Sequence, residues 1–256
     1  MKIEGSVIIL TGASTGIGRA LLEKLLEKGA YVVAVSRHMT SQSIEHDNLL
    51  KLDLDLVSKA AVDTLFEASL SRFKTIDAFI ANAGFAYYRK EDVPDWENMA
   101  TIVQTNVTSV IYSAQKMKAL KGTDPFNFMA TLSAVSYLSM PGYALYGMTK
   151  MGLRGFMDSW RLELKKGQHA QAVFPVATKT EFFNRANQVR KPWPVQDAEH
   201  VAKVMMRGLE KNKKRIFPSK LFKFGFALAP WGFKVYVAQE RRAFLRIMHQ
   251  DKDKGE

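Results

Sequence analysis

Three side chains of this sequence have the types and the spacing that proton transfer requires. Tyr146 and Lys150 lie four residues apart in a segment of helical periodicity, so both project from one face of the predicted helix. Ser133 precedes Tyr146 by thirteen residues and ends a predicted strand. A free tyrosine has a pKa of about 10, and a neighbouring cation moves it toward a value useful for general acid–base catalysis. We therefore expect Tyr146 to exchange a proton with a bound molecule.

A glycine-rich segment, Thr11–Gly18, follows the first predicted strand and opens a helix that runs to Lys28. Glycines omit the Cβ atoms that would block close approach, and a helix start offers unpaired N–H groups and the positive end of its dipole. The segment therefore predicts a pyrophosphate site. Its spacing, G-x-x-x-G-x-G, differs from the commoner dinucleotide fingerprint G-x-G-x-x-G, so a turn with only a packing role is the alternative.

The elements that must position these residues alternate along the chain. Short β-branched runs are followed by longer segments of helical periodicity, which is the pattern of βαβ units around a parallel sheet buried on both faces. The rhythm breaks between Thr180 and Gln196, where we expect a long loop over the end of the sheet. Six strands and a weaker seventh are predicted, over residues 7–11, 31–36, 49–52, 77–82, 127–132, 170–174 and 215–217.

Composition excludes several classes of protein. The chain has 256 residues, 47% hydrophobic and 24% charged, which is ordinary globular usage, and one α/β domain can reach about 250 residues. The lack of cysteine excludes disulfides, thiolate metal sites and a cysteine nucleophile, and it fits a cytoplasmic location. None of the five histidines has a metal-binding spacing, so we expect no metal. The longest uncharged apolar stretch, residues 224–233, is too short to span a bilayer.

A Tyr and a Lys at this spacing also occur on many solvated helices, so the surrounding motifs decide whether this pair has a function. The glycine turn, Asn82-Ala83-Gly84, Asn106, Ser133 and the Tyr146–Lys150 pair follow one another in an order that resembles the short-chain dehydrogenase/reductase family. The resemblance covers about residues 1–210. It implies an α/β fold, a doubly wound parallel sheet (Rossmann fold) with strand order 3-2-1-4-5-6-7, in a single domain with a basic, aromatic C-terminal extension.

The resemblance also implies a role for each catalytic candidate. Asn106, Ser133, Tyr146 and Lys150 match the family's catalytic tetrad. Tyr146 would be the acid–base and Ser133 would hold the substrate oxygen. Lys150 would bind the nicotinamide ribose and, with the nicotinamide cation, lower the pKa of Tyr146, while Asn106 would anchor a proton-carrying water.

The expected cofactor is NADP. Family members that use NAD carry an acidic residue near the end of the second strand, where this chain has Ser36 followed by Arg37, and an arginine can pair with a 2′-phosphate. Asp53 would accept from the adenine amine, or would alternatively cap the next helix. The residues expected to bind the cofactor are Gly12, Ser14, Thr15, Gly16, Ile17, Gly18, Ser36, Arg37, Asp53, Leu54, Asn82, Ala83, Gly84, Tyr146, Lys150 and Thr180.

One position near the nicotinamide departs from the family pattern. The family usually has Pro-Gly followed four residues later by Thr, whereas this chain has Val176 in place of the glycine and keeps Thr180. A positive φ angle at Val176 would be costly, so the local backbone path is open to question. Gly152 and Gly155 lie inside the helix of Tyr146, which predicts close packing of another backbone there, and in the family this helix often helps to build a dimer face.

The leading hypothesis is an NADP-dependent oxidoreductase that transfers a hydride to or from a carbonyl compound or secondary alcohol. The alternatives are a catalytically silent cofactor-binding sensor or scaffold of the same fold, and nucleic-acid binding through basic charge alone, which lacks a recognition motif. Aromatic and other apolar side chains near the motifs favour a bulky or apolar substrate, although they could equally pack the loop. These side chains are Phe85, Tyr87, Tyr88, Met140, Tyr143, Phe182, Phe183 and Trp193.

The last 56 residues carry most of the net charge of +12, since residues 201–256 contain fourteen basic and five acidic residues. We divide the chain into an NADP-binding catalytic domain, residues 1–217, and an extension, residues 218–256. Aromatic residues alternate with lysines between Ile216 and Lys234, as in segments that lie at a membrane surface. The extension is therefore predicted to contact an anionic membrane, a second subunit of a homodimer or homotetramer, or its own domain.

Overall fold

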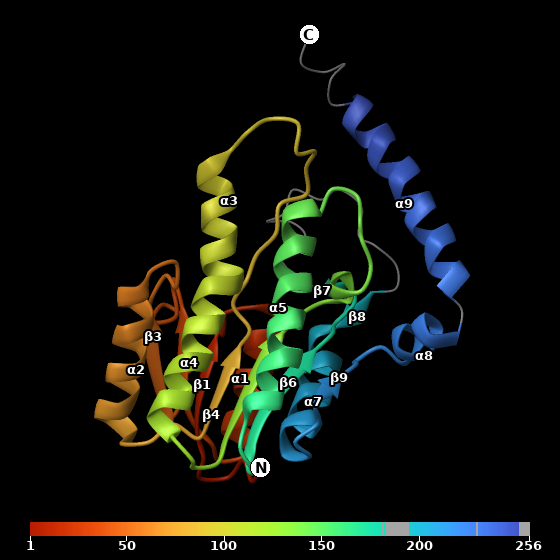
Figure 1. The fold of residues 1–256 in the computed structure, drawn as a ribbon. Coiled ribbons are helices and arrows are strands. Elements are labelled where there is room, and N and C mark those ends of the chain that lie inside the picture. Colours follow the sequence, from red (N-terminus) through yellow and green to blue (C-terminus); the bar gives the residue numbers. More distant parts are fainter. Residues whose placement is uncertain (181, 183–194, 229, 251–256) are drawn as a thin grey trace.

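A parallel sheet of seven strands forms the centre of the molecule (Figure 1). The fold is that of a computed structural model, which describes residues 1–180, 182, 195–228 and 230–250. The strand order is β3-β2-β1-β4-β5-β6-β9, and a separate two-residue ladder pairs β7 with β8. The strands are β1 (Val7–Thr11), β2 (Tyr31–Ser36), β3 (Leu49–Asp53), β4 (Ala78–Ala81), β5 (Phe126–Thr131), β6 (Gln168–Val173), β7 (Thr178–Lys179), β8 (Gln196–Asp197) and β9 (Arg215–Ile216).

Helices cover both faces of the sheet. Helices α2, α4 and α5 bury their apolar sides against one face, and α1 and α7 pack together against the other. The helices are α1 (Gly16–Glu27), α2 (Lys59–Phe73), α3 (Trp96–Val103), η1 (Gln104–Thr108), α4 (Ser109–Lys121), η2 (Ala134–Ser136), α5 (Ala144–Glu163), α7 (Ala198–Glu210), α8 (Lys220–Leu228) and α9 (Pro230–Gln250). The predicted doubly wound sheet and its strand order are confirmed.

Stacked aromatic rings fix α5 against the sheet. The rings of Phe66, Phe79 and Phe128 follow one another at centroid distances of 5.7 and 5.3 Å, and Trp160 of α5 meets Phe128 edge-on at 5.6 Å. Each such pair adds about 0.5–1.5 kcal/mol to the free energy gained by burial. Because Trp160 lies in the C-terminal half of α5, this packing sets the direction in which its first turns carry Tyr146.

The carboxyl ends of β1 and β4 form the place where the order of the sheet reverses. From β1 the chain crosses to β2 on one side, while β4 and β5 follow on the other. At such a point the loops leave the two central strands in opposite directions and open a crevice between them. The glycine turn and Asn82 follow these two strands directly, so the topology brings the two motifs together.

Several boundaries differ from those predicted. Strand β4 begins after Asp77, whose carboxylate accepts a hydrogen bond from the backbone N–H of Val7 at 2.9 Å, and it ends before Asn82.

No atom of the described residues, beyond the immediate chain, lies within 4 Å of a Cβ built on Gly152 or Gly155. The close packing predicted for these two glycines is therefore absent within the described part of this chain, and both stay open on the surface of α5.

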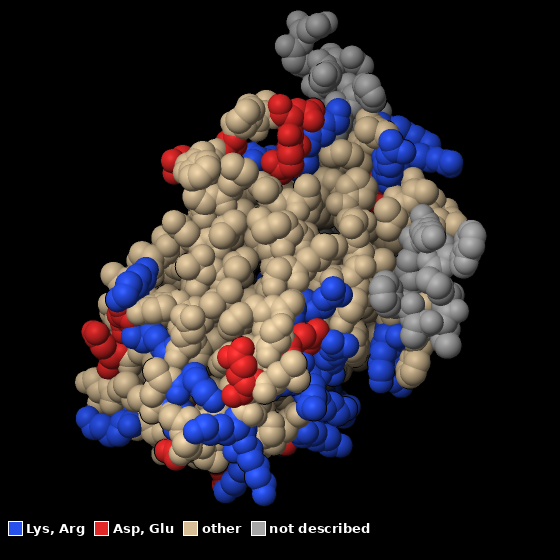
Figure 2. All heavy atoms as spheres, in the orientation of Figure 1, with Lys and Arg blue, Asp and Glu red and all other residues tan. Residues whose placement is uncertain are grey.

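The surface charges are unevenly distributed. In Figure 2, Lys and Arg side chains gather at the lower end of the molecule and beside α9, whereas the middle of this face, over the first turns of α4 and the first half of α5, is mostly uncharged. Within the described ranges, no helix has the length and apolar composition needed to cross a membrane.

Candidate active site

The glycine turn between β1 and α1 leaves room for an anion at the helix start. Gly12 and Gly16 have φ angles of +66° and +57°, which side-chain-bearing residues rarely adopt. A Cβ on Gly18 would lie 1.9 Å from the Gly12 carbonyl oxygen, so only glycine fits there. The N-cap residue Thr15 makes no side-chain hydrogen bond to the helix, and the first turn has no acidic residue. The turn therefore suits the pyrophosphate of a dinucleotide.

A run of hydrogen bonds connects this turn to Lys150 of α5. The Asn82 side chain donates to the Gly12 carbonyl at 3.2 Å, and the Thr131 hydroxyl donates to Asn82 Oδ1 at 3.1 Å. The Lys150 ammonium donates to the Thr131 carbonyl at 2.8 Å. On the other side of Asn82, its backbone N–H donates to the Thr11 hydroxyl at 3.1 Å. The Asn82 motif thus braces the ends of β1, β4 and β5.

Ser133, Tyr146 and Lys150 meet as the sequence predicts. Ser133 follows β5 and forms a side-chain hydrogen bond with Tyr146, which lies in the first turn of α5. The Lys150 ammonium lies one turn further along, 5.7 Å from the centre of the Tyr146 ring. Both side chains are buried, with 8% of Tyr146 and 4% of Lys150 exposed. This arrangement can hold an oxygen atom between two hydroxyls and exclude bulk water.

Burial governs the protonation of this pair. It raises the pKa of Tyr146 to about 12, against the opposing effect of the hydrogen bond with Ser133. It lowers the pKa of Lys150 to about 8, because the ammonium loses its hydration. The lowered tyrosine pKa expected from the sequence is therefore not present in the protein alone, since burial acts in the opposite direction.

Asn106 lies in a π-helical turn, η1, between α3 and α4. Its side chain donates to the Phe85 carbonyl at 2.9 Å and to the Thr149 hydroxyl at 3.3 Å, and its Oδ1 accepts from the Phe85 N–H at 3.1 Å. The wider turn lets the amide reach both partners, and such turns are frequent at functional sites. Asn106 therefore holds the segment after Gly84 against α5, while its role in anchoring a water stays a prediction.

One cavity of about 870 Å³ joins the motifs. It extends from the glycine turn and Arg37, past Tyr146, to the C-terminal helices. Of the predicted site residues, all but Asp53 and Asn106 line it. Those that do are Gly12, Ser14, Thr15, Gly16, Ile17, Gly18, Ser36, Arg37, Leu54, Asn82, Ala83, Gly84, Ser133, Tyr146, Lys150 and Thr180.

The roles predicted for Asp53 need correction. Its carboxylate accepts hydrogen bonds from the backbone N–H groups of Met39 and Thr40 and from the Thr40 hydroxyl, which turns it toward the loop after β2. These hydrogen bonds lower the pKa of Asp53, chiefly those from Thr40. Helix α2 is capped instead by Ser58, whose side chain accepts from the Ala61 N–H at 3.2 Å. Asp53 therefore closes a loop, and Asp55 is the carboxylate that lines the cavity.

The departure at Val176 is accommodated without strain. Val176 is not among the described residues with positive φ, and its side chain lines the cavity and packs partly against the core. Thr180 lies beside the glycine turn, because a Cβ on Gly16 would be 2.7 Å from its Cγ2 atom. Arg19, a second basic residue near the glycine turn, pairs with Glu23 at 2.6 Å and does not line the cavity.

The far end of the cavity is aromatic, as predicted. Tyr88 lies behind it and contacts Tyr143 at a centroid distance of 5.2 Å, and Phe183 and Trp193 fall outside the described residues. The predicted side chains that line the cavity are Phe85, Tyr87, Met140, Tyr143 and Phe182.

Sequence reasoning missed several lining residues. The run of aromatic residues after Ile216 is the one signal in the sequence that the tail could line the cavity. The same run is equally compatible with a membrane or a subunit contact. The structure places Phe222 in the core of the domain. The missed residues include Asp55, Thr101, Thr105, Leu221, Phe222, Gly225 and Tyr236.

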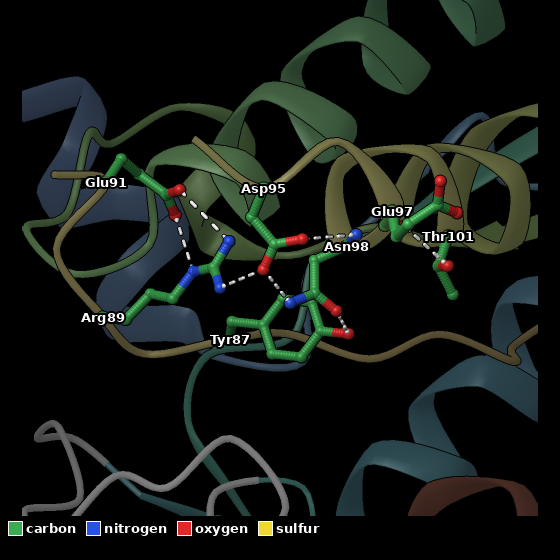
Figure 3. A network of polar contacts seen from close by, with 7 residues as sticks. All are labelled: Tyr87, Arg89, Glu91, Asp95, Glu97, Asn98 and Thr101. Carbon is green, nitrogen blue, oxygen red and sulfur yellow. Dashed lines mark hydrogen bonds and ion pairs between the residues drawn. The ribbon is translucent and has the colours of Figure 1, made fainter. Parts of the chain in front are cut away.

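A polar network holds the rim of the cavity beside Tyr87 (Figure 3). The Tyr87 hydroxyl donates to Asn98 Oδ1 at 2.9 Å, and the Asn98 N–H donates to Asp95 at 3.1 Å. Arg89 pairs with Asp95 at 3.1 Å and with Glu91 at 3.4 Å, and its guanidinium lies 5.2 Å from the Tyr87 ring. Tyr87 is therefore held from its hydroxyl and from its ring face.

The buried ammonium of Lys150 should make stability depend on pH. Its folded pKa of about 8 lies below the unfolded value, so the unfolded chain binds more protons above pH 8 and the free energy of unfolding rises with pH. We expect a rise of roughly 3 kcal/mol between about pH 8 and 10, measured by urea denaturation. Lys150→Met should lack this rise, and the exposed-site control Lys166→Met should keep it. Identical profiles for the wild type and Lys150→Met would contradict the burial of the charge.

Comparison with known proteins agrees with these motifs. The sequence model of the short chain dehydrogenase family matches residues 6–191. An uncharacterised oxidoreductase of Listeria monocytogenes is 31% identical over 199 residues, which cover 72% of this chain and 78% of the relative.

Solved structures share the fold. A short-chain dehydrogenase/reductase from Burkholderia phymatum in complex with NAD aligns with a TM-score of 0.78 at 17% identity, over 92% of this chain and 96% of that chain. A short-chain dehydrogenase from Burkholderia cenocepacia in complex with NADP aligns with a TM-score of 0.78 at 22% identity, over 93% and 99% of the two chains. Together with the match over most of the sequence, they lead to one conclusion: this chain belongs to the short-chain dehydrogenase family of oxidoreductases.

Proposed function

We propose that the protein is an NADP(H)-dependent oxidoreductase that interconverts a carbonyl compound and a secondary alcohol, and that its substrate is bulky or apolar. The observation that carries the proposal is the buried group of Ser133, Tyr146 and Lys150 in a cavity that continues to the glycine turn. Glycines whose Cβ atoms would fill the cradle, and a helix start without acidic residues, support a dinucleotide at the other end.

The residues of the chain would move one proton. When bound, the nicotinamide cofactor supplies a hydride to the carbonyl carbon. Ser133 would hold the carbonyl oxygen by a hydrogen bond, and the Tyr146 hydroxyl would donate its proton to that oxygen to complete the alcohol. The Lys150 ammonium would stabilise the phenolate that remains, and burial of both groups strengthens this interaction by excluding water. Alcohol oxidation would reverse these steps.

Removing the Tyr146 hydroxyl should abolish the chemical step and spare the cofactor site. We expect Tyr146→Phe to lower kcat by about 10²–10⁴, the range of general acid–base catalysis, with the Kd for NADPH unchanged. Tyr112→Phe is the control, because it removes a hydroxyl of α4 that donates to Asp63 at 2.9 Å and does not line the cavity. A Tyr146→Phe enzyme within tenfold of the wild type would exclude this role. NADPH binding without turnover of any ketone or aldehyde by the wild type would favour the sensor hypothesis.

The preference for NADP(H) rests on Arg37. The residue follows β2, lies exposed at the edge of the cavity, and has Ser36 beside it where an NAD enzyme carries an acidic residue. A guanidinium can make paired charge-assisted hydrogen bonds to a 2′-phosphate, which a carboxylate would repel.

Comparing kcat/KM for NADPH and NADH tests this assignment. The wild type should prefer NADPH, and Arg37→Glu should reverse the preference by raising the KM for NADPH. Arg72→Glu is a charge-matched control on α2, because Arg72 is exposed and does not line the cavity. A wild-type preference for NADH would refute the proposal.

We also propose a homodimer or homotetramer that uses the outer side of α5. Met148 and Leu162 are 48% and 87% exposed on this helix, and Gly155 between them has open space around it. The uncharged middle of this face in Figure 2 supports the same surface. An apolar, uncharged helix face suits contact with a second copy.

A charge placed on this face should separate the subunits. Gly155→Arg has room in the monomer, so we expect a folded monomer by sedimentation velocity, whereas the wild type sediments as an oligomer. Ser71→Arg, at an exposed position of α2, should leave the oligomer intact. An unchanged sedimentation coefficient for Gly155→Arg would move the interface away from α5.

The remaining assignments stay predictions. We retain a cytoplasmic location, the division of the chain at residue 217, and peripheral membrane contact through the tail as the sequence suggested them. Membrane contact lacks support, because Phe222 and Phe244 of the tail are buried against the protein itself. Exposed Leu221 and Phe224 are the side chains that remain for such a contact.

A further inference from the structure

The two tail helices, α8 and α9, close the cavity at the end opposite the glycine turn. Leu221, Phe222 and Gly225 of α8 and Tyr236 of α9 line the same cavity as Tyr146. In Figure 1 the two helices lie on the β9 side of the sheet, and α9 runs past the loop that leads into α5. These helices follow the last motif of the catalytic domain, so they contribute a wall that the motifs do not define.

Helix α8 is anchored to the catalytic domain at its first turn. The Phe222 ring is 4% exposed and lies 6.2 Å from the ring of Phe217 and 6.3 Å from that of Tyr137. The Phe222 N–H donates to the Ser219 hydroxyl at 3.1 Å, which caps the helix start. His200 of α7 contacts the carbonyl oxygen of Pro218 at 3.0 Å. Leu221 is thereby fixed at the mouth of the cavity.

Helix α9 reaches the catalytic tyrosine through a line of aromatic rings. Phe244 meets Tyr88 edge-on at 5.4 Å, Tyr88 lies 5.2 Å from Tyr143, and Tyr143 lies 5.9 Å from Tyr146. Gly142 makes room for this contact, because a Cβ there would lie 2.5 Å from Tyr88 and 2.9 Å from Phe244. The tail is therefore packed against the residues that precede α5.

Charge is confined to one end of the cavity. Burial raises the pKa of Tyr143, and the nearby Tyr146, Tyr88, Tyr236 and Glu240 raise it further, which keeps this wall uncharged. The lining residues near the tail are apolar or carry neutral hydroxyls, and Lys150 is the charged lining residue nearest to them. The lining residues of this end are Leu138, Met140, Tyr143, Leu221, Phe222 and Tyr236. An anionic substrate would lose its hydration here beside the carboxylate of Glu240.

We propose that Tyr236 and Leu221 are specificity-determining residues, and that the wall they form selects apolar carbonyl compounds extending from Tyr146 toward the tail. This inference rests on the proposed function for the reaction, and it adds the residues that recognise the apolar substrate and the direction in which that substrate extends. A short ketone held at Ser133 and Tyr146 would not reach the tail helices, whereas a long apolar chain would be covered by them.

The test compares two ketones and two pairs of variants in the full chain. Tyr236→Ala removes a lining ring, and Val235→Ala alters its neighbour, which is 57% exposed and does not line the cavity. Leu221→Ala and Phe224→Ala form a second pair on α8, with exposures of 56% and 54%, of which Leu221 alone lines the cavity. Urea midpoints show which variants fold. If Tyr236→Ala does not fold, the comparison of Leu221→Ala with Phe224→Ala decides the test.

We expect Tyr236→Ala and Leu221→Ala to lower kcat/KM for methyl octyl ketone by about tenfold, since the loss of a few apolar contacts is worth tenfold or more. Turnover of methyl ethyl ketone, the Kd for NADPH, and both control variants should stay within about twofold of the wild type. Equal effects on the two ketones, or equal effects of lining and control variants, would overturn the proposal. So would a wild type that reduces methyl ethyl ketone and not methyl octyl ketone.

A labelling experiment separates failure of this inference from failure of the proposed reaction. The chain has no cysteine, so Tyr236→Cys and Val235→Cys each carry a single thiol. Methyl octyl ketone with NADPH should slow maleimide labelling of Tyr236→Cys several-fold and leave Val235→Cys unchanged. Protection without turnover in the wild type would support the wall and contradict the reaction. Turnover without protection would support the reaction and contradict the wall.

Discussion

The close approach of the glycine turn to the end of β4 is the constraint on which the rest of the site depends. A Cβ on Gly18 would lie 1.9 Å from the carbonyl oxygen of Gly12, and one on Gly12 would lie 2.8 Å from the backbone that follows β4. Because both side chains are absent, Asn82 reaches the Gly12 carbonyl and, through Thr131, the strand end that holds Lys150. The contact that leaves room for an anion thus also fixes the buried ammonium, so the two halves of the site cannot be positioned independently.

Much of this frame is predictable from sequence, because it depends on short local patterns. Apolar β-branched runs predict the buried strands, and fixed spacings place Tyr146 and Lys150 on one helix face. Asp53 shows where such patterns stop. It ends β3 two residues before Asp55, and the strand stops between them, so spacing alone does not say which of the two carboxylates faces the cavity. The pairing of β3 with β2 turns Asp53 toward the loop after β2, and this long-range pairing is not written in the local sequence.

The protonation of Tyr146 and Lys150 fails to follow from spacing for a related reason. Spacing predicts that an ammonium lies near Tyr146, and an ammonium in isolation would lower the tyrosine pKa. The folded chain buries both groups, which raises the pKa of Tyr146 to about 12 and lowers that of Lys150 to about 8. Desolvation disfavours both charged forms, and the protein offers Ser133 and the Thr131 carbonyl as opposing partners. Burial depends on the segments packed above α5. The balance between desolvation and hydrogen bonding at Tyr146 and Lys150 is therefore a property of the fold.

The tail shows why net charge is a poor guide to the ligand. Its basic residues favour an anionic partner when the composition alone is considered. In the structure, Lys220 and Lys223 of α8 are exposed, whereas Phe222 between them is buried and lines the cavity. One helix therefore presents cations to solvent and apolar side chains to the pocket, a division set by helical periodicity. Leu221 lies at the boundary, since it lines the cavity and is 56% exposed. The exposed cations of α8 thus lie outside the end of the cavity that Leu221, Phe222 and Tyr236 line, and the two properties have separate consequences for binding.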